Sequence, residues 1–168
     1  MARPAEAIVP GWYRLYRFAY YREEKTVHQD LEKAKNILRQ ELYTCVLCRG
    51  DAVYTSTFRG VKPLVQWLRS EMDFSGFCAA DKVIGRATAF LYLLLGIPQV
   101  YAQVISRPAL GVFQAHGIHV EYGQLVDNII NRRGDGLCPF EAAVLEIQDP
   151  QQAYAAILHK MDEMNIPY

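Results

Sequence analysis

The chain has 168 residues and a mass of 19.2 kDa, which suits one domain or one domain with an appendage. Its hydrophobic fraction of 51% excludes wholesale disorder, and its eighteen basic and eighteen acidic residues argue against a general binder of nucleic acids or membrane surfaces. The longest apolar run, Phe90 to Leu95, is far shorter than the roughly 20 residues that span a bilayer. No signal-peptide pattern opens the chain, so we expect a soluble cytoplasmic protein.

Residues 1–29 differ from the rest of the chain. Aromatic residues and arginines are interleaved between Trp12 and Arg22, and the segment holds five basic and three acidic residues. Such a pattern stacks on bases in some proteins and packs against the protein's own domain or a partner subunit in others. Because the remaining chain offers no basic field, we favour packing. We predict an N-terminal aromatic and basic extension, residues 1–29, followed by a domain of residues 30–168.

The first half of this domain is predicted to contain a β-hairpin between two helices. The predicted elements are a helix over 30–42, strands over 43–48 and 52–58, and a helix over 61–68. The two strands are joined by a tight turn, which makes them antiparallel. Cys45 and Cys48 form a C-x-x-C sequence, but residues three apart on a strand point to opposite faces. We therefore interpret both as core residues rather than as a metal or redox pair.

The second half is predicted to be built around a long apolar helix. The predicted elements are a helix over 80–95, a strand over 100–105, a helix over 108–116, a strand over 118–122, a helix over 124–131, a short helix from Pro139 and a final helix from Asp149 to about Met164. The helix between the two strands makes them parallel. The predicted fold class is a three-layer α-β-α arrangement, in which a mixed sheet of antiparallel hairpin and parallel strands has helices on both faces.

The order of these elements and four sequence segments carry a resemblance. The segments are Ala52–Ser56, Gly60–Leu64, Cys78–Ala87 and Asn131–Glu141. They make the chain similar to a family of small prokaryotic proteins, the domain of unknown function eighteen ninety-three. The resemblance covers residues 30–164 and implies a cytidine-deaminase-like fold, but it carries no established activity.

The residues at the zinc positions of that fold test for deaminase chemistry. Zinc nucleotide deaminases place His/Cys-x-Glu at the start of the buried helix and Pro-Cys-x-x-Cys at the start of the next helix. Aligned on this chain, the metal ligands fall on Ala79, Ala109 and Val112, and the glutamate falls on Asp81. Hydrocarbon side chains do not coordinate zinc. We therefore expect no metal, no cofactor and no zinc-dependent deamination.

One candidate site lies at the predicted start of the helix over 80–95. Backbone N–H groups at a helix start attract anions, and Asp81, Lys82 and Arg86 are the polar residues there. Lys82 and Arg86 are four residues apart and would share one helical face. We predict that these residues bind a small anionic ligand. The alternative is that Asp81 only caps the helix and that the two cations are solvated.

A second candidate site is the loop that leads to Pro139. Cys138 stands before this predicted helix start, where a thiol is suited to act as a nucleophile, with Asp81 as a second catalytic residue. Arg132, Gly134 and Gly136 would contribute to ligand binding in the same loop. The alternative is a half-buried structural cysteine, because the sequence identifies no partner base.

Three functional hypotheses follow. The first, which we prefer, is a zinc-free protein that binds a nucleotide-like or other anionic small molecule. The second is an enzyme that uses Cys138 with Asp81. The third is an assembly module, a homo-oligomer in which the N-terminal extension makes the contact. The sequence does not decide whether the chain is an enzyme.

Overall fold

The structure is a computed structural model that describes residues 28–40 and 42–168. The predicted N-terminal extension therefore lies outside the described residues, except residues 28 and 29, which belong to the first helix. The elements are a helix over 28–40, β1 (Cys45–Arg49), β2 (Ala52–Ser56), α2 (Lys62–Arg69), β3 (Cys78–Ile84), α3 (Arg86–Leu94), β4 (Gln99–Ser106), α4 (Arg107–Ala115), β5 (His119–Val126), α5 (Pro139–Ala143) and α6 (Pro150–Glu163). None of the described helices is both long enough and apolar enough to cross a membrane.

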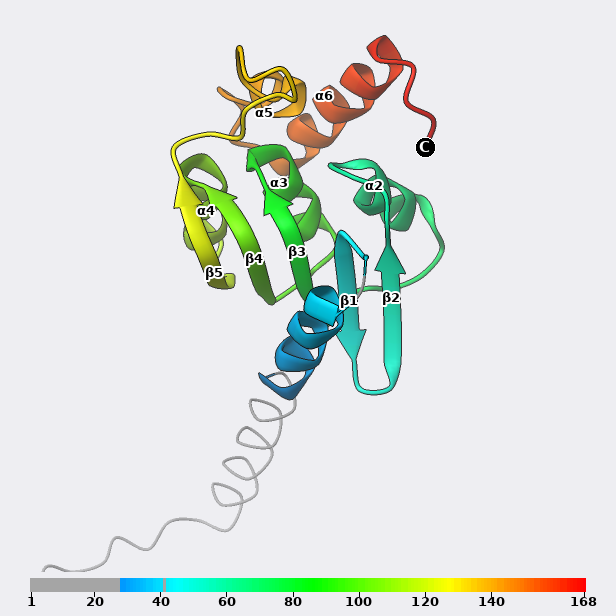
Figure 1. The fold of residues 1–168 in the computed structure, drawn as a ribbon. Helices are drawn as coiled ribbons and strands as arrows, with labels where there is room; N and C mark the ends of the chain where they lie inside the picture. The colour runs from blue at the N-terminus through cyan, green and yellow to red at the C-terminus, as the bar shows by residue number, and fades with distance from the viewer. Residues whose placement is uncertain (1–27, 41) are drawn as a thin grey trace, which may run out of the picture.

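The strands form one five-stranded sheet in the order β2-β1-β3-β4-β5. β1 pairs antiparallel with both β2 and β3, whereas β3, β4 and β5 run parallel to one another (Figure 1). The predicted antiparallel hairpin and the predicted parallel pair, β4 and β5, are both confirmed. The carboxyl ends of the three parallel strands lie at the same edge of the sheet. In Figure 1 this is the upper edge, and the segment that follows β5 lies above it.

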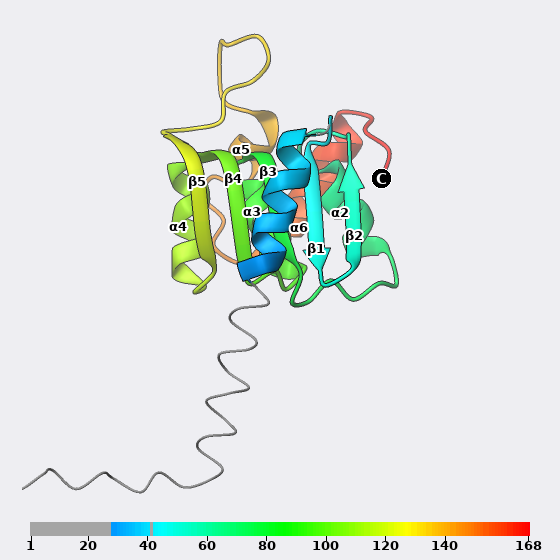
Figure 2. The ribbon, with the colours of Figure 1, turned by 60° about the horizontal axis from the view of Figure 1, so that its bottom comes forward.

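Helices cover both faces of the sheet, as predicted. The helix over 28–40 lies across one face, and α2, α3, α4 and α6 lie behind the other (Figure 2). Each face has its own core cluster, and the cysteines of the C-x-x-C sequence divide between them: Cys45 belongs to the larger cluster and Cys48 to the smaller. The prediction that these two thiols point to opposite faces is confirmed.

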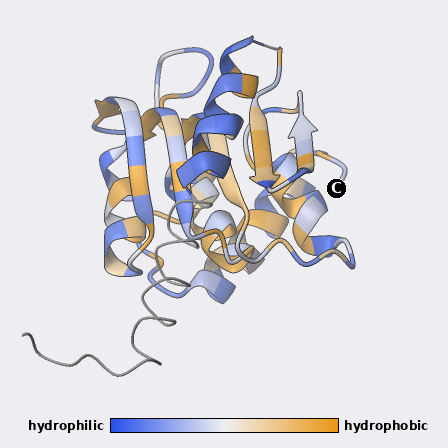
Figure 3. Ribbon diagram, turned by 90° about the horizontal axis from the view of Figure 1, so that it is seen from below, coloured by the Kyte–Doolittle hydropathy of each residue, from blue (hydrophilic) through white to orange (hydrophobic). Residues whose placement is uncertain are grey.

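The central strands are more apolar than the edge strand of the hairpin. Four of the five residues of β1 are buried, whereas β2 has no buried residue. Figure 3 shows this difference as a mostly hydrophobic β1 beside a pale β2. The contrast follows from position, because β1 is paired on both edges and covered on both faces, and β2 ends the sheet.

The single helix predicted over 80–95 is wrong. Residues Cys78–Ile84 form the central strand β3, Gly85 ends it, and the helix α3 begins only at Arg86. Five of the seven residues of β3 are buried because helices cover both faces of the sheet. Such a strand lacks the alternation of apolar and polar residues that identifies a half-buried strand, and its alanines suit a helix equally well.

The helix predicted over 124–131 is also wrong. β5 continues to Val126, and the residues from Asp127 to Cys138 form a loop. The loop folds back on itself through a β-bridge between Ile130 and Leu137. β5 pairs with β4 along one edge only and has no buried residue. Its half-buried residues Leu125 and Val126 follow three exposed ones, so the alternation that identifies a strand does not reach its end.

Candidate functional site

A pocket of about 680 Å³ lies at the carboxyl end of β3. Its walls come from the start of α2, the start of α3, the loop after β5, the start of α5 and the chain's last residues. In Figure 1, α5 and the loop before it lie above the upper ends of the parallel strands. Open α/β sheets commonly bind ligands at this edge, because the loops that follow parallel strands converge there.

The walls of the pocket are mainly aliphatic. Val61 and Val83 come from the start of α2 and the end of β3, Ile129 and Ile130 from the loop after β5, and Ile166 from the C-terminal segment. These segments are far apart in the sequence. The pocket therefore exists only in the folded chain, and no local sequence pattern predicts that these aliphatic walls lie together.

Glu141 ties three elements together beside the pocket. Its carboxylate is buried; Oε2 accepts a hydrogen bond from the backbone N–H of Arg86 at 2.5 Å, and Oε1 accepts one from the Ser106 hydroxyl at 2.7 Å. The negative charge thus sits at the N-terminus of α3, where the helix dipole stabilises it. A Cβ atom on Gly85 would lie 2.4 Å from Glu141 Oε2, so a glycine is required for this approach.

The guanidinium of Arg86 serves the same junction rather than the pocket. Arg86 Nε donates to the carbonyl oxygen of Val144 at 3.0 Å, and Nη2 donates to that of Ile147 at 2.5 Å. The group also lies over the ring of Phe90, 5.2 Å from its centroid. Arg86 thereby satisfies the carbonyl groups that follow α5 and fixes α5 against α3. Its predicted role in ligand binding finds no support in these contacts.

The helix starts that were predicted to bind an anion already hold groups of the protein. The N–H of Arg86 at the start of α3 donates to Glu141, and the N–H of Ala109 in the first turn of α4 donates to Ser106 Oγ at 3.3 Å. Ser106 is the N-cap residue of α4. These two N–H groups are therefore already engaged within the protein.

Asp81 lies inside β3, not at a helix start, and it does not line the pocket. Its Oδ2 accepts a hydrogen bond from the Tyr92 hydroxyl at 2.7 Å, and its Oδ1 accepts one from the N–H of Val83 at 3.0 Å. The Tyr92 hydroxyl is also 2.9 Å from Cys45 Sγ. Burial raises the pKa of Asp81 to about 6, although the hydrogen bond from Tyr92 opposes that shift. The predicted placement of Asp81 at the mouth of a site is wrong.

Lys82 shares no helical face with Arg86, because Lys82 is a residue of β3. Its backbone N–H donates to the carbonyl oxygen of Thr44 at 3.0 Å, and the residue does not line the pocket. Asp81 and Lys82 belong to a strand and Arg86 to the helix that follows it, so the single helical face predicted for these residues is wrong. Their binding of an anionic ligand stays a prediction.

The loop before α5 does reach the pocket, through Arg132 and Cys138. Asn131 shapes this loop, since its Oδ1 accepts from the N–H groups of Arg133, Gly134 and Asp135. Gly134 has a φ of +75°, which glycine adopts without strain. Gly134 and Gly136 are not among the lining residues, so their predicted contact with a ligand is replaced by a role in the turn.

Cys138 is half-buried, lines the pocket and occupies the N-cap position of α5. Its backbone N–H donates to the carbonyl oxygen of Ile129 at 2.8 Å, which closes the base of the loop. Within residues 28–40 and 42–168, no side chain forms a hydrogen bond with its thiol. Cys138 therefore lines the pocket, but no described side chain is hydrogen-bonded to its thiol to act as a base.

The zinc comparison changes once the strand is recognised. Ala79 lies inside β3, and Ala109 and Val112 are buried on α4, so none of the three lines the pocket. The residues that line it near the starts of α2 and α3 are Arg59, Gly60, Val61, Gly85, Ala87 and Thr88. In the part of the chain that the structure describes, no group of three or more His, Cys, Asp and Glu residues is arranged to hold a metal ion.

Sequence reasoning missed Arg59, Gly85, Thr88 and Glu141, which all line the pocket. A signal for one of them was present. Gly85 stands between an apolar run and the helix-forming segment Arg86–Leu94, a pattern typical of a strand that turns into a helix at the binding edge of an α/β sheet. The role of Glu141 depends on a contact across 55 residues, which no local pattern reveals.

The fold and the pocket define the class of the protein: an α/β domain with a mixed five-stranded sheet and a pocket at the carboxyl ends of its parallel strands. The model of DUF1893, a domain of unknown function also labelled TM1506, matches residues 33–161, and the chain belongs to this family. This confirms the family predicted from sequence, whereas the cytidine-deaminase-like fold stays a prediction.

A solved structure is similar to this chain. The crystal structure of a DUF1893 family protein (TM1506) from Thermotoga maritima is 28% identical in sequence and has a TM-score of 0.73. The similarity covers 79% of this chain and 90% of that chain. The comparison with curated proteins gave no match.

Proposed function

We propose that the chain binds a small organic anion, with nucleotide-like molecules among the candidates, in the pocket at the carboxyl end of β3. The observation that carries the proposal is an apolar pocket of ligand size with arginines at its mouth. Pockets for small molecules have volumes of roughly 300 to 1,000 Å³ and combine apolar walls with a few polar groups. The volume of about 680 Å³ and the aliphatic walls fit this description.

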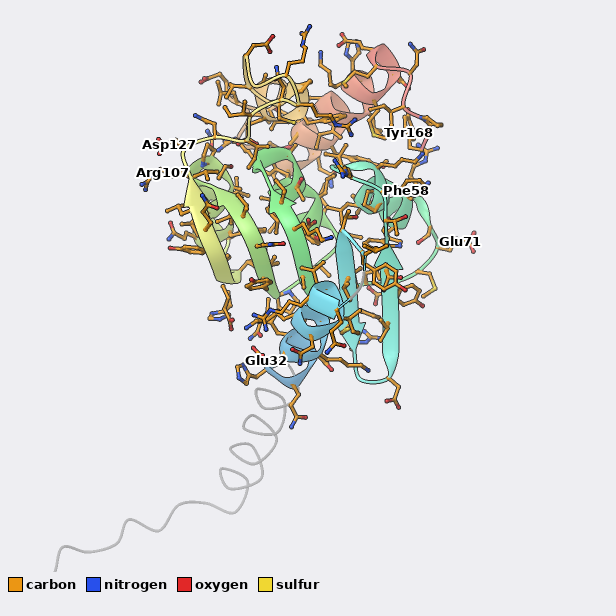
Figure 4. The ribbon with its side chains drawn as sticks, in the orientation of Figure 1. Glu32, Phe58, Glu71, Arg107, Asp127 and Tyr168 are labelled. Carbon is orange, nitrogen blue, oxygen red and sulfur yellow. The ribbon has the colours of Figure 1, made fainter. Side chains whose placement is uncertain are left out.

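The charge at the mouth of the pocket supports an anionic ligand. Arg59, Arg132 and Arg133 all line it and are exposed. Within residues 28–40 and 42–168, Arg59 and Arg132 form no ion pair, and Arg133 is only 3.6 Å from Asp135 through its Nε. By contrast, Arg107 at the neighbouring helix start is paired with Asp127 at 2.9 Å (Figure 4). Uncompensated guanidinium groups beside an apolar pocket favour a carboxylate or phosphate.

The deaminase-like fold belongs to the same proposal. The sheet order, with an antiparallel hairpin on one side and three parallel strands on the other, supports it. Under this proposal the starts of α2 and α3 occupy the positions that carry zinc ligands in the deaminases. None of the residues that line the pocket there has a side chain of the kind that binds zinc in proteins; they are Arg59, Gly60, Val61, Gly85, Ala87 and Thr88. Binding, rather than zinc-dependent deamination, is therefore the function proposed.

Calorimetric titration of the full chain tests the proposal. The probes are AMP, CMP, octanoate, octyl phosphate and inorganic phosphate, compared between the parent chain and two variants. Arg132→Gln removes a charge from the mouth of the pocket. Arg39→Gln, on the helix that covers the opposite face of the sheet, is the matched control. We expect one organic anion per chain, with binding weakened about tenfold or more by Arg132→Gln and unchanged by Arg39→Gln.

Two results would count against the proposal. Absence of binding by every organic anion at millimolar concentration excludes a functional anion pocket of this kind. Equal weakening by Arg132→Gln and Arg39→Gln shows that the binding reflects general charge instead of this site.

A second candidate function is catalysis by Cys138, because its thiol lines the same pocket. The lack of a hydrogen-bonded base among the described residues ranks it second. Iodoacetamide labelling between pH 5 and 9, with and without a bound anion, separates the two ideas. A catalytic thiol reacts rapidly at neutral pH and is protected by ligand, whereas an ordinary thiol reacts appreciably only above about pH 8.

A further inference from the structure

Resting on the function proposed above, we infer that the ligand has a hydrocarbon body and an anionic head, as in a medium-chain alkyl carboxylate or alkyl phosphate, rather than a nucleobase. The inference follows from which polar groups of the pocket are already engaged, from where its apolar residues are exposed, and from where its positive charge lies.

A nucleobase requires hydrogen-bond acceptors as well as donors, and the acceptors of the described pocket residues are mostly engaged. Both carboxylate oxygens of Glu141 accept hydrogen bonds within the protein. The Oδ1 atom of Asn131 accepts from three backbone N–H groups of its loop, and its Nδ2 donates to Asp135 at 2.8 Å. The polar side chains of the lining that remain are Thr88 and the arginines, and guanidinium groups only donate. A base bound here would leave its N–H donors with few acceptors, and unpaired buried polar groups oppose binding strongly.

Aromatic stacking surfaces are also scarce. Among the lining residues, Phe140 is the single aromatic side chain, and it is buried in the main core cluster. Proteins that bind bases usually stack them on exposed aromatic rings. The arginines of the lining are exposed at its mouth, and its walls are mainly aliphatic, which suits a hydrocarbon chain without any directional requirement.

The rim of the pocket exposes apolar surface that a hydrocarbon would cover. Val83, Ile130 and Met164 line the pocket and are 44%, 52% and 42% exposed. They come from β3, the loop after β5 and the residue that follows α6. Phe58, which lies near the end of β2 in Figure 4, is a further exposed apolar side chain and directly precedes Arg59. A concentration of exposed apolar residues around one pocket marks a binding surface.

The anionic head is placed by charge. Arg59 lies on the side of α2 and Arg132 in the loop after β5, so positive groups flank the apolar pocket from two segments. Because Glu141 already occupies the start of α3, the head interacts with these guanidinium groups at the mouth, and the hydrocarbon body enters the pocket. Carboxylates and phosphates share this recognition, and the experiment distinguishes them.

The test is calorimetric titration of the full chain with octanoate, octyl phosphate, 1-octanol, acetate and AMP. Octanoate and octyl phosphate are used below the concentrations at which they form micelles. We expect one octanoate or octyl phosphate per chain, binding about tenfold or more tighter than AMP, 1-octanol or acetate. The stronger of the two anionic amphiphiles identifies the head group.

Matched variants locate the site. Ile130→Asn replaces an exposed apolar residue of the rim, and Leu145→Asn replaces one that is 40% exposed and does not line the pocket. Ile130→Asn is expected to weaken octanoate about fivefold or more, whereas Leu145→Asn leaves it unchanged. Melting temperatures of both variants without ligand show that each remains folded.

Each outcome decides between the inference and the function on which it rests. Binding of AMP without binding of either amphiphile overturns the hydrocarbon inference and leaves the anion pocket intact. No binding of any anion overturns both. Several octanoate molecules per chain, or equal loss in Ile130→Asn and Leu145→Asn, shows non-specific association and also overturns the inference.

Discussion

Gly85 and Glu141 are in such close contact that neither tolerates a larger neighbour. The carboxylate of Glu141 is fixed by two hydrogen bonds, and it lies so close to the backbone of Gly85 that there is no room for a side chain on that residue. This contact connects the end of β3 to α5. At the scale of single residues, the pocket depends on a glycine and a buried acid, neither of which was among the predicted site residues.

Gly85→Ala is expected to lower the free energy of unfolding by about 1 to 3 kcal/mol, because the added methyl group would displace a fixed carboxylate. Urea denaturation measures the change. Gly111→Ala is the matched control: no atom lies within 4 Å of its Cβ position, and it is in α4. There alanine is expected to stabilise the chain by about 0.5 to 1 kcal/mol. Equal effects of the two substitutions would contradict the packing argument.

Asp81 makes stability depend on pH. Its folded-state pKa of about 6 lies above the ordinary value of 3.8, so the folded chain holds this proton more tightly than the unfolded chain. Stability is therefore lost as the pH rises from about 4 to 6. Asp81→Asn removes the effect, and its amide can donate to the Tyr92 oxygen while the Tyr92 hydroxyl turns toward Cys45.

We expect the free energy of unfolding of Asp81→Asn, relative to the parent chain, to rise by about 3 kcal/mol between pH 4 and pH 8. Denaturation at several pH values in that range measures this difference. A difference that stays constant with pH would mean that Asp81 is not held protonated by burial.

Among the predicted site residues, the sequence located Arg132 and Cys138 at the pocket and misplaced Asp81 and Lys82. The successful pair lies in a loop with clear turn residues before a proline, where local sequence determines local structure. Asp81 and Lys82 depended on assigning one segment as helix. Once that segment is a strand, alternate residues point to opposite faces and the four-residue spacing has no meaning.

At the scale of elements, two helix caps that look alike in sequence differ in what they support. Ser106 caps α4 and also donates to buried Glu141, whereas Asp149 caps α6 through the N–H of Gln152. Ser106→Ala is expected to cost about 2 to 4 kcal/mol, because it also leaves a buried carboxylate oxygen unpaired. Asp149→Ala loses only the cap and is expected to cost about 1 kcal/mol.

Thermal and urea denaturation of these two variants and of Glu141→Gln provide the comparison. The losses from Ser106→Ala and Glu141→Gln should not add, since both remove the same hydrogen bond. Additive losses, or equal losses from the two caps, would show that Ser106 acts as a cap alone.

The elements on the periphery of the sheet were easier to predict from sequence than its centre. The helix over 28–40 and α6 each have one buried side, so their apolar residues recur with the period of a helix, and the hairpin is marked by its short turn at Gly50 and Asp51. β3 is covered on both faces and lacks such a period. Its identity follows from its partners β1 and β4, and these pairings are long-range contacts that a single window of sequence does not contain.

At the scale of the whole molecule, the four cysteines report on folding. Cys45, Cys48 and Cys78 are buried and Cys138 is half-buried, and none of the four takes part in a disulfide bond. We expect one thiol per chain to react with a soluble disulfide reagent in the native state, and the other three only on unfolding. Cys138→Ser should abolish the fast reaction. More than one fast thiol in the parent chain would mean that the core opens without global unfolding.

The order of the walls along the chain has a consequence for synthesis. A nascent chain that has reached Val126 contains every strand of the sheet, yet Ile129, Ile130, Cys138, Glu141 and the C-terminal lining residues have still to be made. All strands of the described sheet are thus synthesised before the pocket walls are complete. A small molecule that needs the complete pocket encounters it only after Met164 and Ile166 have been made and have folded back onto the other walls.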